Sequence, residues 1–310
     1  MNHKKISLSF VILFLVALIS VNEVFAWNKT GHKVITAIAW DNLSTEARKN
    51  IIEVLKQAPA NSDLSNLFDH SIKNAEKEWF MNASYWPDIV RDRKKKERWE
   101  QYHKGPWHYI GRYWKESRMG PVDVPDIEST EPNSIERLYH FNESLRSNET
   151  SGSDKAVQIA WVLHLVGDSH MPLHNASRVT KKHPDGDRGG NSFKLRDEWP
   201  KNLHAYWDGI IDVQFQLDRD QLQHKDYVKL AKKITKAHPK KDFNNKITSL
   251  DFNSWSMEGY EIVKSGVYEK DLKEGVFPSE AYQKYAFEKA SARIALSGYR
   301  LAEMLNSIFG

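Results

Sequence analysis

The residues best suited to metal chemistry occur as two histidine–aspartate pairs. His164 and Asp168 stand four positions apart, and so do His204 and Asp208. On a helix, residues four apart project from the same face, so each pair offers an imidazole and a carboxylate to one metal ion such as zinc. A single pair of this kind is more often a hydrogen-bonded surface pair. Two pairs set among apolar residues favour the metal-binding interpretation.

The segment that follows Asp168 adds a third candidate ligand. It reads Ser-His170-Met-Pro172-Leu-His174. Proline cannot continue a helix, so Pro172 would let His174 turn towards a second metal ion. Nothing in the spacing demands that His170 be a ligand, and we place it in the core or just behind the ligands.

The first 26 residues have the features of a cleaved signal peptide. Two lysines open the segment, residues 8–21 are nearly all apolar, and Val24 and Ala26 hold the small-residue positions before a cleavage site. The apolar run is short for a membrane span, which needs about 20 residues; an uncleaved anchor is the alternative. We therefore expect a mature protein that is exported to the periplasm or the medium and is not embedded in a membrane.

Cleavage after Ala26 would give Trp27 a free α-amine. The amine and the carbonyl oxygen of one residue can chelate a metal ion in a five-membered ring. The alternative is that Trp27 is simply a core aromatic near a chain end. Its position at the expected cleavage site favours the metal-binding role.

Composition indicates a folded domain and says little about partners. The chain has 310 residues, of which 40% are hydrophobic and 12% aromatic, enough for a sizeable core. Loss of residues 1–26 removes two lysines and one glutamate and lowers the formal charge from +4 to +3, too near balance to indicate nucleic acid by itself. The chain has no cysteine, which excludes thiolate metal sites and, in an exported protein, favours a bacterial source.

Most of the mature chain reads as helical. Apolar periodicity and capping signals predict helices over residues 31–40, 44–55 (capped by Ser44), 153–166, 203–216 and about 279–308. Loops are predicted over residues 91–105, 119–132 and 181–191. Convincing alternating strands are scarce. We therefore expect one all-α domain over residues 27–310, with long loops.

Several motifs occur in the order known from one enzyme family. They are Trp27 with His32, Trp86-Pro-Asp88-Ile-Val-Arg91, Trp107-His108-Tyr-Ile, the run from His164 to His174, Gly189-Gly190-Asn191 and His204-x3-Asp208. In these motifs the chain resembles the S1/P1 nuclease family, the zinc-dependent single-strand nucleases and 3′-nucleotidases of moulds, plants and bacteria. The resemblance covers nearly the whole mature chain. It implies a mostly helical domain, similar to zinc phospholipase C, with a three-zinc cluster in a cleft.

The resemblance also implies a ligand set for three zinc ions per chain. The implied ligands are Asp88, His108, His164 and Asp168 for the first ion, the amine and carbonyl of Trp27 with His32 and a bridging Asp168 for the second, and His174, His204 and Asp208 for the third. Nitrogen and oxygen donors of this kind suit zinc. Three divalent ions outweigh three carboxylates, so the site would stay cationic, as phosphate binding requires.

The implied reaction is hydrolysis of single-stranded DNA and RNA to products with 5′-phosphates, together with hydrolysis of 3′-nucleotides. Zinc lowers the pKa of water to about 7, so no protein nucleophile is needed and Asp88 and Asp168 would serve catalysis as ligands. Arg91, three residues after Asp88, is the candidate for binding the transition state with its planar donors. The alternative is that Arg91 belongs to a solvated run of basic residues that extends to Arg98.

Substrate contacts are expected from two further positions. Tyr109 is placed to stack on a base, with core packing as the alternative, and Asn191 follows two flexible glycines that let it approach a phosphate. One position departs from the family pattern: Gly111 stands where members often carry an acidic residue associated with base contact, which puts base recognition in doubt.

Two other functions compete with the nuclease. Zinc phospholipase C resembles the chain in its three-zinc site and processed N-terminal tryptophan, but its last pair is typically His-x3-Glu and its first histidine lies further from the tryptophan. A periplasmic zinc-binding protein usually carries dense histidine tracts, whereas these ligands are spread from residue 27 to residue 208. A folded cage of this kind favours catalysis, and no stable protein partner is implied.

Overall fold

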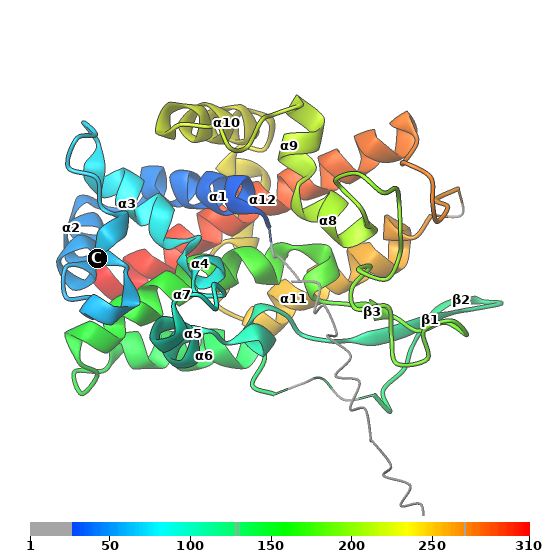
Figure 1. Ribbon diagram of the computed structural model, residues 1–310, viewed down its shortest axis with the longest axis horizontal. Coiled ribbons are helices and arrows are strands. Elements are labelled where there is room, and N and C mark those ends of the chain that lie inside the picture. The colour runs from blue at the N-terminus through cyan, green and yellow to red at the C-terminus, as the bar shows by residue number, and fades with distance from the viewer. Residues whose placement is uncertain (1–26, 128, 130, 270) are drawn as a thin grey trace, which may run out of the picture.

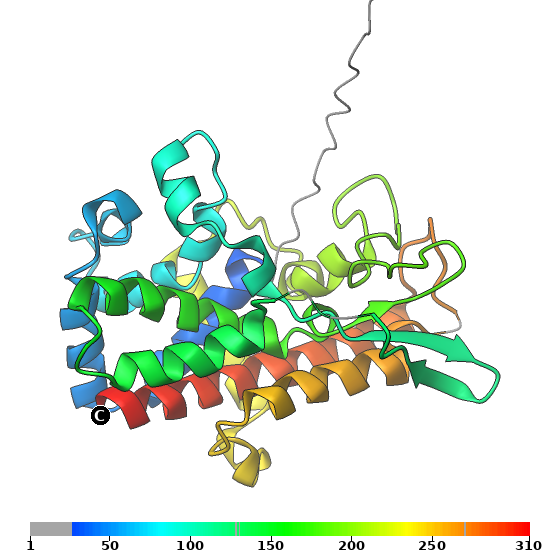
Figure 2. The same ribbon diagram turned by 90° about the horizontal axis from the view of Figure 1, so that it is seen from below.

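The computed structural model describes residues 27–127, 129, 131–269 and 271–310. The expected signal peptide, residues 1–26, lies outside the described residues. Figures 1 and 2 show a molecule built mainly of helices, with one small sheet at one end. The prediction of a mostly helical fold is confirmed. Within the described ranges, no helix combines the length and the apolar character that a membrane crossing requires.

The helices follow one another along the chain with short connections. The α-helices are α1 Lys29–Asn42, α2 Thr45–Leu55, α3 Ala75–Ala83, α4 Trp86–Ile89, α5 Lys96–Tyr102, α6 Ser134–Arg146, α7 Gly152–His170, α8 Leu203–Asp208, α9 Ile210–Phe215, α10 His224–Ala237, α11 Phe252–Ile262 and α12 Glu280–Phe309. Single helical turns are η1 Ala60–Ser62, η2 Ser65–Leu67, η3 Gly105–His108, η4 Pro172–His174, η5 Lys240–Asp242, η6 Asn244–Lys246 and η7 Val263–Val267.

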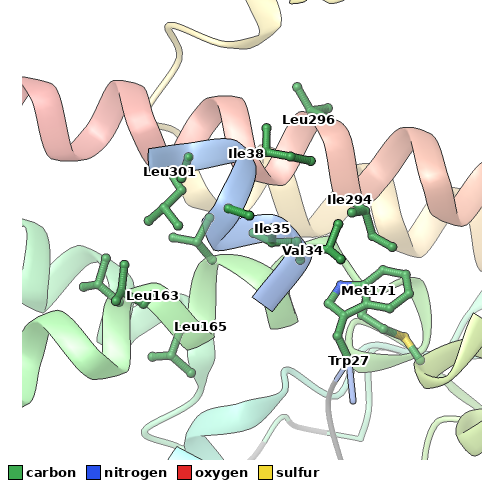
Figure 3. Packing of buried hydrophobic residues seen from close by; sticks show 14 of the residues in the cluster. Trp27, Val34, Ile35, Ile38, Leu163, Leu165, Met171, Ile294, Leu296 and Leu301 are labelled. Carbon is green, nitrogen blue, oxygen red and sulfur yellow. The ribbon is translucent and has the colours of Figure 1, made fainter. Parts of the chain in front are cut away.

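Three helices, α1, α7 and α12, form the centre of the core and pack against one another. In Figure 3, Ile35 and Ile38 of α1 lie in the same cluster of buried side chains as Leu163 and Leu165 of α7 and Leu296 and Leu301 of α12. The approach of α1 to α12 depends on a glycine, because a Cβ at Gly298 would lie 2.7 Å from Cβ of Ile38. This packing fixes where α1 and α7 present their polar residues.

The sheet joins two segments that leave the centre of the molecule. Strand β1 (Tyr113–Ser117) pairs antiparallel with β2 (Gly120–Asp123) and parallel with β3 (Ser177–Arg178), in the order β2-β1-β3. β1 follows η3 closely and β3 follows η4 closely. Their pairing therefore holds the ends of η3 and η4 beside each other, which a backbone bond from Ile110 N to His174 O (2.9 Å) reinforces.

Serines cap two of the predicted helices, and Ser44 is the cap that the sequence predicted. Ser44 Oγ accepts a hydrogen bond from Ala47 N at the start of α2, and Ser279 caps α12 in the same way. Helix α7 begins slightly earlier than predicted, with Ser151 as its cap, and runs to His170, four residues beyond the predicted end. It stops where Pro172 forbids continuation.

Three sequence predictions were wrong in detail. The helix predicted over residues 203–216 is two helices, because the chain breaks at Gly209, where a Cβ would lie 2.4 Å from the ring of Trp199. The loop predicted over residues 91–105 contains α5, whose first residues belong to the charged run. The loop predicted over residues 119–132 begins inside a β-hairpin and contributes β2.

Candidate metal centre

Eight histidine and aspartate side chains from separate parts of the sequence converge in the interior. Each is at most 6% exposed. Their ligand atoms form three groups in which all members lie within 4.8 Å of one another: His32, Asp88 and His164; His108, His164 and Asp168; and His174, His204 and Asp208. The structure thus brings together every side chain that the sequence proposed as a ligand. The third group has the expected membership, while His32 is grouped with Asp88 and His164.

Asp168 of α7 belongs to the second group and also faces His32 of the first. Its Oδ2 is 3.1 Å from His108 Nδ1 and 3.3 Å from His164 Nε2, and its Oδ1 is 3.3 Å from His32 Nε2. His32 reaches it because α1 passes close to α7 at Gly167, where a Cβ would lie 2.9 Å from the His32 ring. One carboxylate therefore faces three imidazoles from three elements.

Backbone carbonyls orient three of the histidines, two of which, His164 and His204, lie on helices. His164 Nδ1 lies 2.7 Å from Ser84 O, and His204 Nδ1 lies 2.7 Å from Gly189 O. A carbonyl oxygen only accepts, so each Nδ1 carries the proton, and the lone pair of each neutral ring is then on Nε2. Metal-binding histidines commonly have their free ring nitrogen held in this way.

The third group is assembled by η4, α8 and the loop before α8. His204 Nε2 is 3.3 Å from Asp208 Oδ2, as the one-turn spacing predicts, and His174 Nε2 is 4.0 Å from Asp208 Oδ1. His174 Nδ1 donates to His108 O at 2.6 Å. This bond links the third group to the segment that supplies a ligand to the second.

The donor set fits a divalent metal ion. Both ring nitrogens of His32, both carboxylate oxygens of Asp208 and Oδ1 of Asp168 are buried and have no hydrogen-bond partner among the described residues. Leaving one buried polar group unpaired costs about 1–3 kcal/mol, so several in one place call for a ligand that their lone pairs can share. Imidazole and carboxylate without thiolate match zinc and its neighbours among the divalent metals.

Burial raises the pKa values of the aspartates, which bound metal would lower again, and lowers the pKa of His164, which keeps its ring neutral for metal binding. Burial raises the pKa of Asp168 to about 7, against the opposing effect of His32, and it raises the pKa of Asp208 well above its usual range. Burial lowers the pKa of His164 to about 4. The His164 imidazole is therefore neutral, as a ligand must be, and the carboxylates need nearby positive charge to stay ionised.

Arg91 is part of the centre and not of the solvated run that follows it. It is only 8% exposed, and its guanidinium lies 3.1 Å from Asp88 Oδ1. The short helix α4 that carries Asp88 is anchored by Trp86, whose indole N–H donates to Ser62 O at 2.6 Å. Residues 92–97 are exposed, whereas Arg98 is buried and pairs with Asp63 at 2.8 Å.

The two predicted substrate residues lie directly after η3 and in the loop after β3. Tyr109, directly after η3, is partly buried, and its carbonyl accepts from Ser134 N at 3.2 Å. Asn191 donates its side-chain amide to Arg188 O at 2.8 Å, within its own loop. At Gly111 a Cβ would lie 3.2 Å from the Tyr113 hydroxyl, so the neighbouring tyrosine restricts any larger side chain there.

Trp27 is completely buried at the edge of the centre. Its indole N–H donates to Gly167 O at 2.9 Å, next to Asp168 in the chain. The following residue, Asn28, donates its backbone N–H to Asp208 O at 3.2 Å. Residues 27 and 28 therefore run between the segments that carry Asp168 and Asp208, and the ring also packs in the core (Figure 3).

Sequence reasoning missed the groups that hold these ligands in place. The carbonyls of Ser84 and Gly189 gave no signal, because every residue has a carbonyl group. Gly167 did give one, since a glycine inside a helical pattern often marks a close packing contact. A search for such glycines beside candidate ligands would have found it.

The geometry agrees with the comparisons with known proteins. A model of the family described as S1/P1 nuclease matches residues 27–310. Endonuclease 2 of Arabidopsis thaliana is 26% identical over 323 residues, which cover 100% of this chain and 99% of that protein. Endonuclease 1 of the same plant is 26% identical over 321 residues, covering 96% of this chain and 92% of that protein. The similarity therefore extends over the full set of candidate ligands.

Proposed function

The chain belongs to the S1/P1 nuclease family, and we propose that it is an exported zinc-dependent phosphodiesterase that cuts single-stranded DNA and RNA to products with 5′-phosphates. We propose 3′-nucleotides as further substrates. The observation that carries the proposal is the set of three buried His/Asp groups, in which the His32 nitrogens and the Asp208 oxygens have no hydrogen-bond partner among the described residues. Such groups are suited to hold metal ions beside a phosphate.

Nine residues would hold three zinc ions per chain. One ion would be held by Asp88, His108, His164 and Asp168, a second by Trp27, His32 and Asp168, and a third by His174, His204 and Asp208. When bound, such ions neutralise phosphate oxygens and lower the pKa of water to about 7. Because of this chemistry, the scheme needs no serine, cysteine or histidine nucleophile.

Arg91 would complete the centre as a substrate-binding cation. Asp88 holds its guanidinium at 3.1 Å, so the fork is oriented before substrate arrives. A planar guanidinium donates two parallel hydrogen bonds to phosphate oxygens. It would contribute most when charge accumulates on those oxygens in the transition state.

Burial of the ligands supports the preference for single strands. All eight ligand side chains are nearly inaccessible, and a flexible strand can bring a phosphate into such a site more easily than a stacked duplex can. Export is supported by the lysines, the apolar run over residues 8–21 and the small residues before position 27.

The experiment that tests the function uses the purified mature chain and a panel of substrates. Single-stranded DNA, single-stranded RNA, duplex DNA, 3′-AMP and phosphatidylcholine are incubated with the protein, with and without a chelator, and zinc is then restored. We expect faster cleavage of single strands than of duplex, 5′-phosphate ends, and loss of activity that zinc reverses. Release of 3′-phosphate ends, or hydrolysis of phosphatidylcholine alone, would contradict the proposal.

The non-enzyme alternative is a zinc-binding protein. It predicts zinc bound by the same residues with no hydrolysis of any of these substrates. Metal analysis on the same samples separates the two, because only the nuclease couples zinc content to the rate of cleavage.

A further inference from the structure

A cavity lies beside the candidate metal centre. It measures about 410 Å³ and is bounded by α5, α6 and the N-terminal half of α7, within the range of about 300–1,000 Å³ typical of small-ligand sites. Its walls include the rings of Trp107 and Trp161, whose centroids are 4.9 Å apart. Trp161 also contacts the His108 ring at 5.3 Å, so one wall of the cavity is shared with the centre.

One polar group in this cavity lacks a partner. The side-chain oxygen Oε1 of Gln158 is buried and has no hydrogen-bond partner among the described residues. Gln101, another lining residue, is satisfied, because its Oε1 accepts from Asn61 at 2.7 Å. A buried acceptor left unpaired is costly, so the Gln158 oxygen indicates a ligand that brings a donor.

The cavity and the centre lie along one face of α7. Asp154, Gln158 and Trp161 line the cavity at spacings of four and three, and His164 and Asp168 continue the same spacing into the centre. Residues so spaced share a helix face. With a rise of 1.5 Å per residue, Gln158 and His164 are separated by roughly 9 Å along the axis.

The chemistry of the walls selects among ligands. A purely apolar ligand would leave Gln158 Oε1 unpaired, and the lining carries one cation, Lys104, and one carboxylate, Asp154, whose opposite charges favour a ligand without net charge. A flat, neutral heterocycle with an amino group can stack on the Trp107 or Phe141 ring and donate to Gln158. Glutamine pairs with adenine in this way, accepting from N6 and donating to N7.

We propose that this cavity binds a nucleobase that carries an exocyclic amino group, with Gln158 reading that group and the aromatic walls packing on the base. The inference rests on the proposed action on nucleic acid, since the same enzyme would meet such bases in every strand. The base belongs either to the bound strand or to a free nucleoside, and the two sources share this chemistry.

The binding test uses adenosine and inosine as probes for the mature, metal-loaded chain, followed by calorimetry. Neither nucleoside carries a phosphate, and inorganic phosphate is added to occupy the metal centre. Inosine has a carbonyl where adenosine has the amino group, so we expect adenosine to bind at least about tenfold more tightly. Gln158→Met should abolish this preference, whereas Gln221→Met, at an exposed position, should keep it.

The kinetic test separates the two sources of the base. If the base belongs to the strand, Gln158→Met raises KM for an adenine-containing oligonucleotide and not for its hypoxanthine counterpart. If the base belongs to a free nucleoside, adenosine still binds and KM is unchanged. Failure of the wild-type chain to bind adenosine, or equal binding of inosine, overturns the inference while strand cleavage persists. Adenosine binding without cleavage of any nucleic acid would instead overturn the proposed function.

Discussion

Asp168 is the residue on which the candidate centre depends most. It faces His32, His108 and His164 within 3.3 Å, and burial raises its pKa to about 7. Asp168→Asn preserves the shape but removes the negative charge and one ligand oxygen. Because loss of groups that merely support a metal ligand costs about 10–100-fold, we expect a larger loss of activity together with reduced metal content. Metal analysis and initial rates check this, and a fully active, fully loaded variant would contradict the assignment.

Arg91 should behave differently from the ligands. Arg91→Ala leaves the imidazoles and carboxylates in place, so metal content should match that of the wild-type chain. The rate at saturating single-stranded DNA should fall by about 10²–10³-fold, as for other donors that act on transition-state charge. Arg93→Ala, in the exposed part of the basic run, is the matched control and should change neither quantity. Loss of metal from Arg91→Ala would assign this arginine a structural role.

Gly167 offers a test of how closely α1 must approach α7. Helix propensity alone says that Gly167→Ala should stabilise α7 by up to about 1 kcal/mol. The added Cβ would lie 2.9 Å from the His32 ring, so we expect the ring to shift and the affinity for metal to fall. Metal titration of the variant checks this. An unchanged affinity for metal in Gly167→Ala would show that the His32 ring has room to move.

At the scale of elements, the end of α7 is held by a buried ionic junction. Arg293 of α12 donates from Nε to His170 O at 3.1 Å, and Arg300 Nη1 lies 2.9 Å from His170 Nε2. Both arginines pair with Glu258 of α11. The junction joins α7, α11 and α12 just beyond Asp168. It explains why His170, which the sequence placed in the core or behind the ligands, is buried there.

Glu258 should make stability depend on pH in acid. Burial would raise its pKa, but Arg300 and Arg293 outweigh burial and lower the pKa from 4.5 to about 2. A depressed pKa gives stability that is present above about pH 4.5 and is lost as the pH falls towards 2. We expect Glu258→Gln to lower the free energy of unfolding at pH 7 by about 3–5 kcal/mol, because it leaves buried charges unpaired.

The difference between wild-type and Glu258→Gln chains should shrink between about pH 4.5 and pH 2. Urea unfolding at several pH values measures it. Glu261→Gln, on the same helix with an exposed carboxylate paired to Lys264, should show little effect at any pH. A difference between wild-type and Glu258→Gln chains that stays constant into acid would mean that Glu258 does not titrate in this window.

The elements differed in how far the sequence predicted them. Helices α7 and α12 were predicted because their apolar residues recur at helical spacing, although the cap of α7, Ser151, lies before the predicted start. Helix α6 was missed although Asn133 and Glu136 form a capping box, and α10 was missed although its buried residues recur every three or four positions. The break between α8 and α9 had no local cause strong enough to predict, since it depends on the contact of Gly209 with Trp199.

At the scale of the whole molecule, the candidate centre is a product of long-range packing. Its side chains come from α1, α4, η3, α7, η4 and α8. Local sequence patterns predicted only the pairs within α7 and α8 and the turn of His174 after Pro172. The joining of His32, Asp88 and His108 to them was predicted through resemblance to a family, because no short-range rule says that α1 packs on α7. The structure adds the carbonyls and glycines that make this packing specific.

Trp27 is the residue through which the proposed cleavage of the signal peptide would affect this centre. Trp27 is buried, its indole N–H is bound to Gly167 O, and Asn28 is bound to Asp208 O. If the amine of Trp27 is a ligand, cleavage of the signal peptide creates part of the metal site. An uncleaved peptide nitrogen has its lone pair delocalised into the carbonyl and cannot donate it to a metal ion.

We therefore expect a chain with one extra methionine before Trp27 to bind less metal and to turn over slowly. The control is a chain of the same length extended after Gly310, which is exposed. This control should behave as the processed protein does. Trp27→Phe, correctly processed, keeps the amine but loses the bond from the indole to Gly167 and part of the buried ring, so it should keep its metal and lose about 1–3 kcal/mol of stability. Metal analysis, rates and urea unfolding on matched samples separate these effects. Equal metal content and equal rates with and without the N-terminal extension would show that Trp27 serves the fold alone.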